Sequence, residues 1–247
     1  MTTPTGDRGT SRDQGSGGRA RPAAEHPLAR IVRAAAAGRF PPVDGQVEVV
    51  DPYLDGVEAV VAFTGHAVVA TRVPLGPLVA AGADGFAGAT SIPVMTLLAG
   101  EGGTVDVLDA LLVAPGTGGG LLPAATDLQG HPRVAYARAW RRDVHAFADE
   151  RGLVTLSRGL GGLLELSFEV DAARRGAGLG RSLLRDALAL APPGEPVLAA
   201  VAPGNAASLR ALLAAGFTPL GSVQLVRPSR TARCRSPATT EWEPRIP

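Results

Sequence analysis

A strand, a glycine turn, a helix and a second strand follow one another between residues 163 and 202, and this order constrains the fold more than any other feature. LLELSFEV, from Leu163 to Val170, predicts the first strand, and VLAAVA, from Val197 to Ala202, predicts the second. Between them, the helix is indicated by the spacing of its apolar residues, Leu179, Leu183, Leu184, Ala187 and Leu188. Such a βαβ unit joins parallel strands by a right-handed crossover, so an α/β fold is expected.

The glycine turn in this unit, RRGAGLGR, has the character of an anion site. It lies at the carboxyl end of a strand and at the amino end of a helix, where free backbone N–H groups and the helix dipole favour negative charge. Its three glycines remove side chains that would hold a phosphate away, and Arg174, Arg175 and Arg181 add positive charge. A diphosphate is therefore the expected ligand.

The spacing of the glycines excludes a dinucleotide fingerprint. G-x-G-x-x-G starting at Gly176 needs a third glycine where Arg181 stands, and no acidic residue follows at the end of a second strand about 20 positions on. The stretch does match R-x-x-G-x-G through Arg175, Gly178 and Gly180.

With this motif the chain resembles the GNAT superfamily of acyl-CoA-dependent N-acyltransferases. A second feature supports the resemblance: PGNAASLRALLAAGF is similar to the family's helix that begins at an asparagine and ends in Gly-Phe, here Asn205, Gly216 and Phe217. The resemblance covers about residues 144 to 226. It implies an α/β (α+β) fold with a mixed, splayed central sheet of the acyl-CoA N-acyltransferase type, preceded by an N-terminal αβ extension.

The resemblance also implies a function and a cofactor site. Acetyl-CoA would be the co-substrate, and an amine would attack its thioester directly, without a covalent enzyme intermediate. The pantetheine arm would lie between the splayed ends of the two parallel strands. The residues expected to contact acetyl-CoA are Phe168, Val170, Arg175, Gly176, Ala177, Gly178, Gly180, Arg181 and Asn205. The backbone N–H of Val170 would serve the developing oxyanion.

Direct transfer needs a base that makes the amine neutral, and Glu165 and Glu169 are the candidates. They are four residues apart, so an unbulged strand points both the same way. The alternative is that they face solvent or pair with Arg158 or Arg174.

The departing thiolate needs a proton, and many relatives supply it from a tyrosine at the position of Leu212. Leucine cannot donate a proton. Ser208, Ser222 or water is left to do so, unless the thiolate leaves unassisted or the chain has lost activity; Ser208 is also a common type of local backbone partner. Two rival functions therefore stay open, a non-catalytic acyl-CoA sensor or scaffold and a plain structural domain.

The rest of the chain divides by composition into four predicted parts. Residues 1–25 and 228–247 resemble disordered tails, residues 26–130 form an N-terminal αβ region of unknown role, and residues 131–227 form the N-acyltransferase core. In the N-terminal region, LARIVRAAAAGRF predicts a helix, a second helix starts near Pro93, and Thr64, Gly65 and His66 mark a hairpin between two β-rich runs.

Composition excludes several classes of chemistry. The chain has no lysine, so neither a P-loop nor a pyridoxal phosphate Schiff base can form. Cys234 is the single cysteine, and the four histidines are scattered, so no metal site is expected. His66 and His131 each follow a glycine and are either surface turn residues or part of an acceptor pocket.

Charge and hydropathy give expectations about location and partners. The formal net charge of +1 and a slightly acidic folded part favour neither nucleic acid nor a membrane as partner. No apolar run is long enough for a membrane span and the first residues lack the apolar core of a signal peptide, so a cytoplasmic protein is expected. The expected acceptor is a small-molecule amine or a protein amino terminus, and a homodimer is compatible with the sequence.

Overall fold

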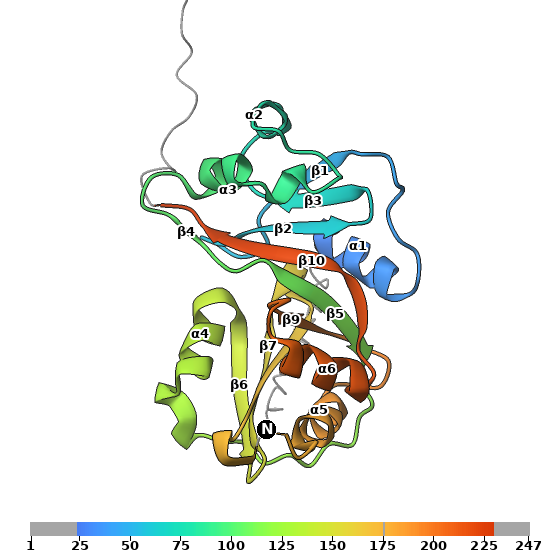
Figure 1. The fold of residues 1–247 in the computed structure, drawn as a ribbon, viewed down its shortest axis with the longest axis vertical. Coiled ribbons are helices and arrows are strands. Elements are labelled where there is room, and N and C mark those ends of the chain that lie inside the picture. The colour runs from blue at the N-terminus through green and yellow to red at the C-terminus, as the bar shows by residue number, and fades with distance from the viewer. Residues whose placement is uncertain (1–23, 175, 230–247) are drawn as a thin grey trace, which may run out of the picture.

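The computed structural model describes residues 24–174 and 176–229, which form one mixed ten-stranded sheet with helices on both faces (Figure 1). The strand order is β1-β3-β2-β10-β5-β9-β8-β7-β6, and β4 pairs with β10 beside this path. The strands are β1 (Val47–Val50), β2 (Glu58–Phe63), β3 (His66–Ala70), β4 (Thr104–Val105), β5 (Asp109–Pro115), β6 (Arg142–Asp149), β7 (Gly152–Arg158), β8 (Leu164–Val170), β9 (Pro196–Val201) and β10 (Thr218–Arg227). The predicted α/β class with a mixed central sheet is confirmed.

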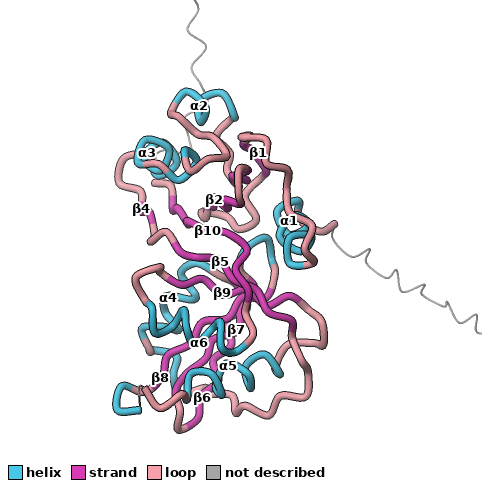
Figure 2. Tube along the Cα trace, turned by 45° about the vertical axis from the view of Figure 1, so that its right-hand side comes forward, coloured by secondary structure: helices cyan, strands magenta, loops and turns pink. Residues whose placement is uncertain are grey.

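The helices are distributed over the two ends of this sheet. They are α1 (Pro27–Ala36), α2 (Leu75–Ala80), α3 (Ile92–Ala99), α4 (Pro132–Trp140), α5 (Leu179–Ala189) and α6 (Ala206–Ala215), with short 3₁₀ turns η1 (Gly88–Thr90), η2 (Asp127–Gly130), η3 (Leu160–Gly162) and η4 (Ala172–Arg174). Figure 2 shows α2 and α3 at one end and α4, α5 and α6 at the other. The stretch VAYARAW, residues 134–140, is compatible with helix or strand by its sequence alone, and the structure places it in α4.

The predicted hairpin and first helix are both present. Gly65 sits between β2 and β3 with a φ of +71°, and a Cβ there would lie 2.4 Å from the Val43 side chain. The helix α1 begins after His26, whose Nδ1 accepts a hydrogen bond from the backbone N–H of Leu28 at 3.2 Å. At the hairpin turn, position 65 requires glycine because other residues rarely adopt a positive φ.

The predicted βαβ unit is confirmed as β8, α5 and β9, and β8 and β9 are parallel. In α5, the residues Leu183, Leu184, Ala187 and Leu188 are buried, as their spacing predicts. The apolar spacing of residues 205–216 alone predicts that Leu209, Leu212 and Leu213 all face inward, and for Leu213 this prediction is wrong, because it is exposed. The buried face of α6 is carried by Leu212 and Ala215 instead, which are three residues apart and so share a face.

Strand β5 joins the two predicted regions into one sheet. It pairs antiparallel with β9 on one side and with β10 on the other, although it precedes residue 131 in the chain. In Figure 1, β5 and β10 cross the middle of the molecule, with the N-terminal elements above and β6 to β9 below. The predicted division at residue 131 therefore falls inside a continuous sheet.

The helix α1 covers the junction of these regions from one face. Leu28 and Val32 are buried in a core that also contains Leu163 of the later region and Val61 of β2. The tight approach explains Gly161, where a Cβ would lie 2.8 Å from the backbone nitrogen of Ala29. Burial of these apolar groups stabilises the whole sheet rather than one half of it.

Several predictions concern residues outside the described ranges. They are the predictions for Arg175, for Cys234 and for the two expected tails, of which only residues 24, 25, 228 and 229 are described. Over residues 24–174 and 176–229, no helix has the length and apolar character needed to cross a membrane.

Candidate functional site

The parallel strands β8 and β9 separate after two pairs of residues. Leu164 pairs with Val197 and Glu165 with Leu198, and the register ends there although β8 continues to Val170. A cavity of about 170 Å³ lies where the strands diverge. We call it the strand opening; its walls include residues 166–168 of β8, residues 199–202 at the end of β9, and Asp109, Arg133, Tyr136, Arg141, Asn205, Ser208 and Leu212.

The glycine turn next to β8 has an open backbone. Gly176 and Gly178 have φ values of +85° and +75°, and a Cβ built on either meets no atom within 4 Å. Gly178 is the N-cap residue of α5, and among the described residues no side chain caps this helix. Arg181 and Ala177 are exposed, while Arg175 lies outside the described residues. The turn thus presents backbone N–H groups without side chains over them, which suits an anion.

Gly180 has a packing role instead. A Cβ there would lie 3.3 Å from Val170 Cγ2 and 3.4 Å from Ala211 Cβ. Its missing side chain lets α5 approach both β8 and α6, and this close approach positions the turn at the end of the strand opening.

The start of α6 forms another wall of the strand opening. The Asn205 side-chain oxygen accepts a hydrogen bond from the backbone N–H of Ser208 at 3.1 Å, so the predicted N-cap is confirmed. Asn205, Ser208 and Leu212 all line the cavity. Leu212 is 1% exposed and brings only methyl groups to the position where the resemblance implies a proton donor.

Glu165 does not face solvent and does not pair with Arg158 or Arg174. Its Oε1 lies 2.5 Å from Nη2 of Arg141, and its Oε2 accepts a hydrogen bond from the backbone N–H of Leu160 at 3.4 Å. Burial alone would lower the pKa of the Arg141 guanidinium, but the adjacent carboxylate raises it above its ordinary value. Arg141 therefore stays charged beside Glu165.

Glu169 is paired as well. Its Oε2 accepts a hydrogen bond from Nε of Arg133 at 3.0 Å, and its side chain is 38% exposed. Arg133 lies in α4, and Arg141 directly follows that helix. Both glutamates thus point toward the same helix, as the four-residue spacing predicts.

The remaining predicted residues are distributed around these groups. Phe168 lines the strand opening, and Val170 pairs with Gly152 in the antiparallel ladder of β7 and β8. His66 Nδ1 lies 2.9 Å from Asp44 Oδ1 at the other end of the sheet, and His131 caps α4. Neither histidine lines the strand opening, so the acceptor-pocket alternative for them loses its basis.

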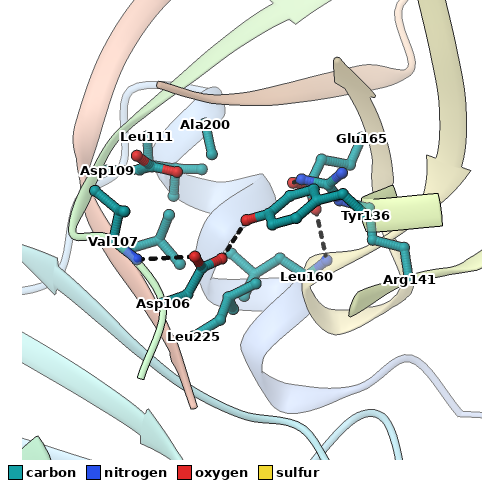
Figure 3. A pocket seen from close by; sticks show the side chains of 11 residues that line it. Asp106, Val107, Asp109, Leu111, Tyr136, Arg141, Leu160, Glu165, Ala200 and Leu225 are labelled. Carbon is teal, nitrogen blue, oxygen red and sulfur yellow. Dashed lines mark hydrogen bonds and ion pairs between the residues drawn. The ribbon is translucent and has the colours of Figure 1, made fainter. Parts of the chain in front are cut away.

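A second, smaller cavity adjoins the strand opening, and several of its charged residues were missed by the sequence reasoning. We call it the acidic cavity; the polar residues lining it are Asp106, Asp109, Tyr136, Arg141 and Glu165. Asp109, Tyr136 and Arg141 also line the strand opening, so the two cavities share a wall. In Figure 3, Asp106 and Asp109 lie on one side of the view and Glu165 and Arg141 on the other, with the ring of Tyr136 between them.

The surroundings of the acidic cavity raise the pKa values of Asp109 and Tyr136. Burial, together with the negative charges of Asp106 and Glu165, raises the pKa of Asp109 to about 6. Burial and a hydrogen bond donated by the Tyr136 hydroxyl to Asp106 raise the pKa of Tyr136, so the phenol keeps its proton at neutral pH. The signal in the sequence was two aspartates beside the apolar run of β5, in TVDVLDALLV.

Comparisons with known proteins give likenesses of fold only. No family model and no curated protein matches the chain. Similar solved structures include an acetyltransferase of the GNAT family from Colwellia psychrerythraea (TM-score 0.34, 14% identity, 51% of this chain and 57% of that chain). Another is a conserved protein of unknown function from Staphylococcus epidermidis (TM-score 0.35, 13% identity, 51% of this chain and 62% of that chain). A third is a putative acetyltransferase of the GNAT family from Novosphingobium aromaticivorans (TM-score 0.34, 18% identity, 53% of this chain and 70% of that chain). The chain thus spans less than two thirds of the first two structures. TM-scores this low support no conclusion about function, for which the cavity geometry is the basis.

Proposed function

We propose that the protein is an N-acyltransferase that moves an acetyl group from acetyl-CoA to an amine by direct attack. The observation that carries this proposal is the strand opening beside an uncapped helix with a bare glycine turn. The opening leaves the facing edges of β8 and β9 without a ladder beyond Glu165 and Leu198, so an extended chain can hydrogen-bond between them. The pantetheine arm of acetyl-CoA is such a chain.

The pyrophosphate of acetyl-CoA would bind at the glycine turn. Gly176 and Gly178 let a phosphate approach the backbone, because no atom lies within 4 Å of where a Cβ would be. The amino end of α5 contributes its dipole, and Arg181 contributes a full charge. Arg175 would add a second charge, as the resemblance to the acyltransferase motif implies.

The transfer needs three groups around the thioester. A base takes a proton from the ammonium, a hydrogen-bond donor supports the oxyanion, and an acid protonates the thiolate. Glu165 and Glu169 stay candidates for the base only if the substrate displaces their arginine partners, which are Arg141 and Arg133. The Val170 backbone N–H stays the proposed oxyanion donor.

Two hydroxyl groups line the strand opening and could protonate the thiolate. Ser208 lies in the first turn of α6, and Tyr136 reaches the cavity from α4. The raised pKa of Tyr136 keeps its proton in place at neutral pH. Tyr136 of α4 would then supply the proton that Leu212 cannot donate.

The binding step is tested by thermal unfolding with and without acetyl-CoA. A ligand at 100 times its dissociation constant stabilises a protein by about 2.7 kcal/mol, so a clear rise in Tm is expected. Arg181→Glu is expected to weaken binding by about 1 to 3 kcal/mol, since it replaces a charge-assisted contact by repulsion. Arg185→Glu, one turn further along the exposed face of α5, is the matched control. Equal shifts in both variants would contradict the proposed pyrophosphate site.

The second candidate is a protein that binds acetyl-CoA without turning it over, and Leu212 favours it. A thiol-release assay over a panel of amines separates the two candidates. Release that depends on the amine supports the enzyme, whereas binding without release under any condition supports the sensor or scaffold.

A further inference from the structure

The acidic cavity has more negative than positive groups. The charged residues that line it are three carboxylates, Asp106, Asp109 and Glu165, and one guanidinium, Arg141. The guanidinium is already in an ion pair with Glu165. Asp106 accepts hydrogen bonds from the Val107 backbone N–H and from the Tyr136 hydroxyl, so it too has partners.

Asp109 differs from the other two carboxylates. Within the described part of the chain, its side chain has no hydrogen bond and no ion pair, and it is half-buried on β5. A partly buried carboxylate without a partner is costly, and a cation beside it would remove the cost. Asp109 also lines the strand opening, so a group held there lies beside the proposed path of the thioester.

Arg141 provides the second and independent observation. It is 8% exposed, and its Nε and Nη1 atoms are buried without a hydrogen-bond partner. Buried guanidinium donors are normally satisfied, so two unused ones in the wall of a cavity call for an oxygen atom. A lone ammonium could not supply it.

The acidic cavity is small. It encloses about 20 Å³, which is room for one group of about the size of a water molecule. A primary ammonium has that size, whereas an ammonium with two methyl groups does not. Asp109 and Arg141 both line this cavity, and Figure 3 shows them on the two sides of the view, so a molecule whose ammonium enters the cavity lies among both side chains.

We propose that the acidic cavity is the acceptor subsite of the acyltransferase, in which Asp109 holds the primary ammonium and Arg141 hydrogen-bonds an oxygen of the same molecule. The proposal rests on the proposed function for its chemistry but not for the binding of the amine. The acceptor class is a primary amine with a carbonyl, carboxylate or hydroxyl oxygen close to the nitrogen. The other groups that face Asp109 are Asp106, Glu165 and the phenol of Tyr136.

The transfer step then balances as follows. Asp109 takes one proton from the ammonium, and the neutral amine forms a bond to the thioester carbon of acetyl-CoA. The nitrogen gives up its second proton as the amide forms, the carbon–sulfur bond breaks, and the departing thiolate takes up that proton, so the products are the amide and the thiol of CoA. Asp109 acts near neutral pH because its carboxyl group has a raised pKa.

The experiment is a calorimetric titration of the full chain with four uncharged or cationic probes, with and without CoA present. Alaninamide carries the amine and the oxygen, ethylamine carries the amine alone, and propanamide carries the oxygen alone. We expect alaninamide to bind about tenfold or more tightly than either of the other probes. Alaninamide with two methyl groups on its amine nitrogen keeps the charge, but its ammonium is too large for the cavity, so it should not bind.

The variants separate the two contacts. Asp109→Asn should lose alaninamide binding by about tenfold or more, and Arg141→Lys, which keeps the charge beside Glu165, should lose the preference for alaninamide over ethylamine. Asp127→Asn, an exposed aspartate in η2, is the matched control and should bind as the unchanged chain does. Each variant is first shown to keep its cooperative unfolding transition.

Every outcome decides the proposal. Absence of alaninamide binding at concentrations up to about 10 mM, well above ordinary substrate affinities, overturns it. Unchanged binding of alaninamide to Asp109→Asn also overturns it. If ethylamine binds the unchanged chain as tightly as alaninamide does, the role of Arg141 is overturned. Failure of acetyl-CoA to bind, with alaninamide binding intact, would refute the acyltransferase and leave the amine subsite standing.

Discussion

The two ends of the sheet differ in how completely their strands pair. At one end, β2 and β3 pair over five consecutive residues, and β10 continues the ladder over a further five with β2. At the other end, β8 and β9 pair over two residues and then separate. The closed end carries the fold, and the open end has the space in which a ligand can bind.

The ionisable side chains of the two ends differ in the same way. At the closed end, Glu58 accepts a hydrogen bond from the Thr71 hydroxyl at 2.8 Å, and His66 is held by Asp44. At the open end, Arg141 keeps unused donors and Asp109 has neither a hydrogen bond nor an ion pair within the described residues. Ser91 Oγ, at the closed end, is also buried without a hydrogen-bond partner, but it lines neither cavity, whereas Asp109 and Arg141 line both. Unsatisfied polar groups are uncommon in folded proteins, so their position in a cavity wall marks the open end as a binding site.

The first way to break this comparison is to separate the two regions. Residues 131–247 alone would lack β5, which stands between β9 and β10, so we expect no cooperative unfolding and poor dispersion in amide NMR spectra. Adding residues 24–130 as a second chain should restore a folded complex. A well-dispersed spectrum from residues 131–247 alone would show that the open end does not depend on the closed one.

Arg141→Met should give the next largest effect. It leaves the Glu165 carboxylate buried without its cation, which costs about 3 to 5 kcal/mol of unfolding free energy. The double variant with Glu165→Met removes both charges and should recover most of the loss. Denaturant unfolding measures both, and a single variant as stable as the unchanged chain would refute the buried ion pair.

Gly178→Ala tests the bare turn at the open end. Gly178 has a φ of +75°, so alanine there should cost about 1 to 2 kcal/mol through backbone strain, although its Cβ meets no atom. Gly204→Ala is the comparison, because that glycine has neither a positive φ nor a close neighbour. Equal unfolding free energies for the two variants would contradict the described turn.

Asp109→Asn should have a small effect on the unfolding free energy, and the effect should depend on pH. The pKa of Asp109 is raised to about 6 from 3.8, so the folded chain binds the proton more tightly than the unfolded chain does. The unfolding free energy should therefore fall as the pH rises from about 4 and level off above about 6, because the folded state disfavours the charged carboxylate.

Asparagine carries no charge, so the variant should be more stable than the unchanged chain at pH 8 by about 1 kcal/mol, after allowance for solvent screening, and equally stable at pH 4. Denaturant unfolding at the two pH values measures this difference. A loss of stability at pH 8 would mean that Asp109 is satisfied by a partner of its own.

Local patterns in the sequence predicted the parts of the fold that depend on neighbours along the chain. The βαβ unit, the hairpin at Gly65 and the Asn205 cap follow from hydrophobic spacing, glycine and capping chemistry within about 15 residues. The exposed Leu213 shows the limit of spacing alone, since the side of α6 that packs is set by neighbouring elements.

Long-range contacts could not be predicted in the same way. Nothing near residue 109 indicates that β5 lies between β9 and β10, because strand pairing across about 100 residues leaves no local periodicity. For the same reason Glu165 was given Arg158 or Arg174 as partner, whereas its true partner Arg141 arrives from the end of α4. The glycine turn and the strand opening were thus predicted from the sequence, whereas the acidic cavity was missed.

The position of β10 also bears on how the chain is made. It is the final strand in the described residues, and it lies between β2 and β5. Both of those strands are synthesised and leave the ribosome long before β10 does. Until residues 218–227 emerge, both older strands present unpaired edges that can associate with other nascent chains. Chaperone capture of this chain should therefore be strongest before residues 218–227 emerge and should end when they insert between β2 and β5.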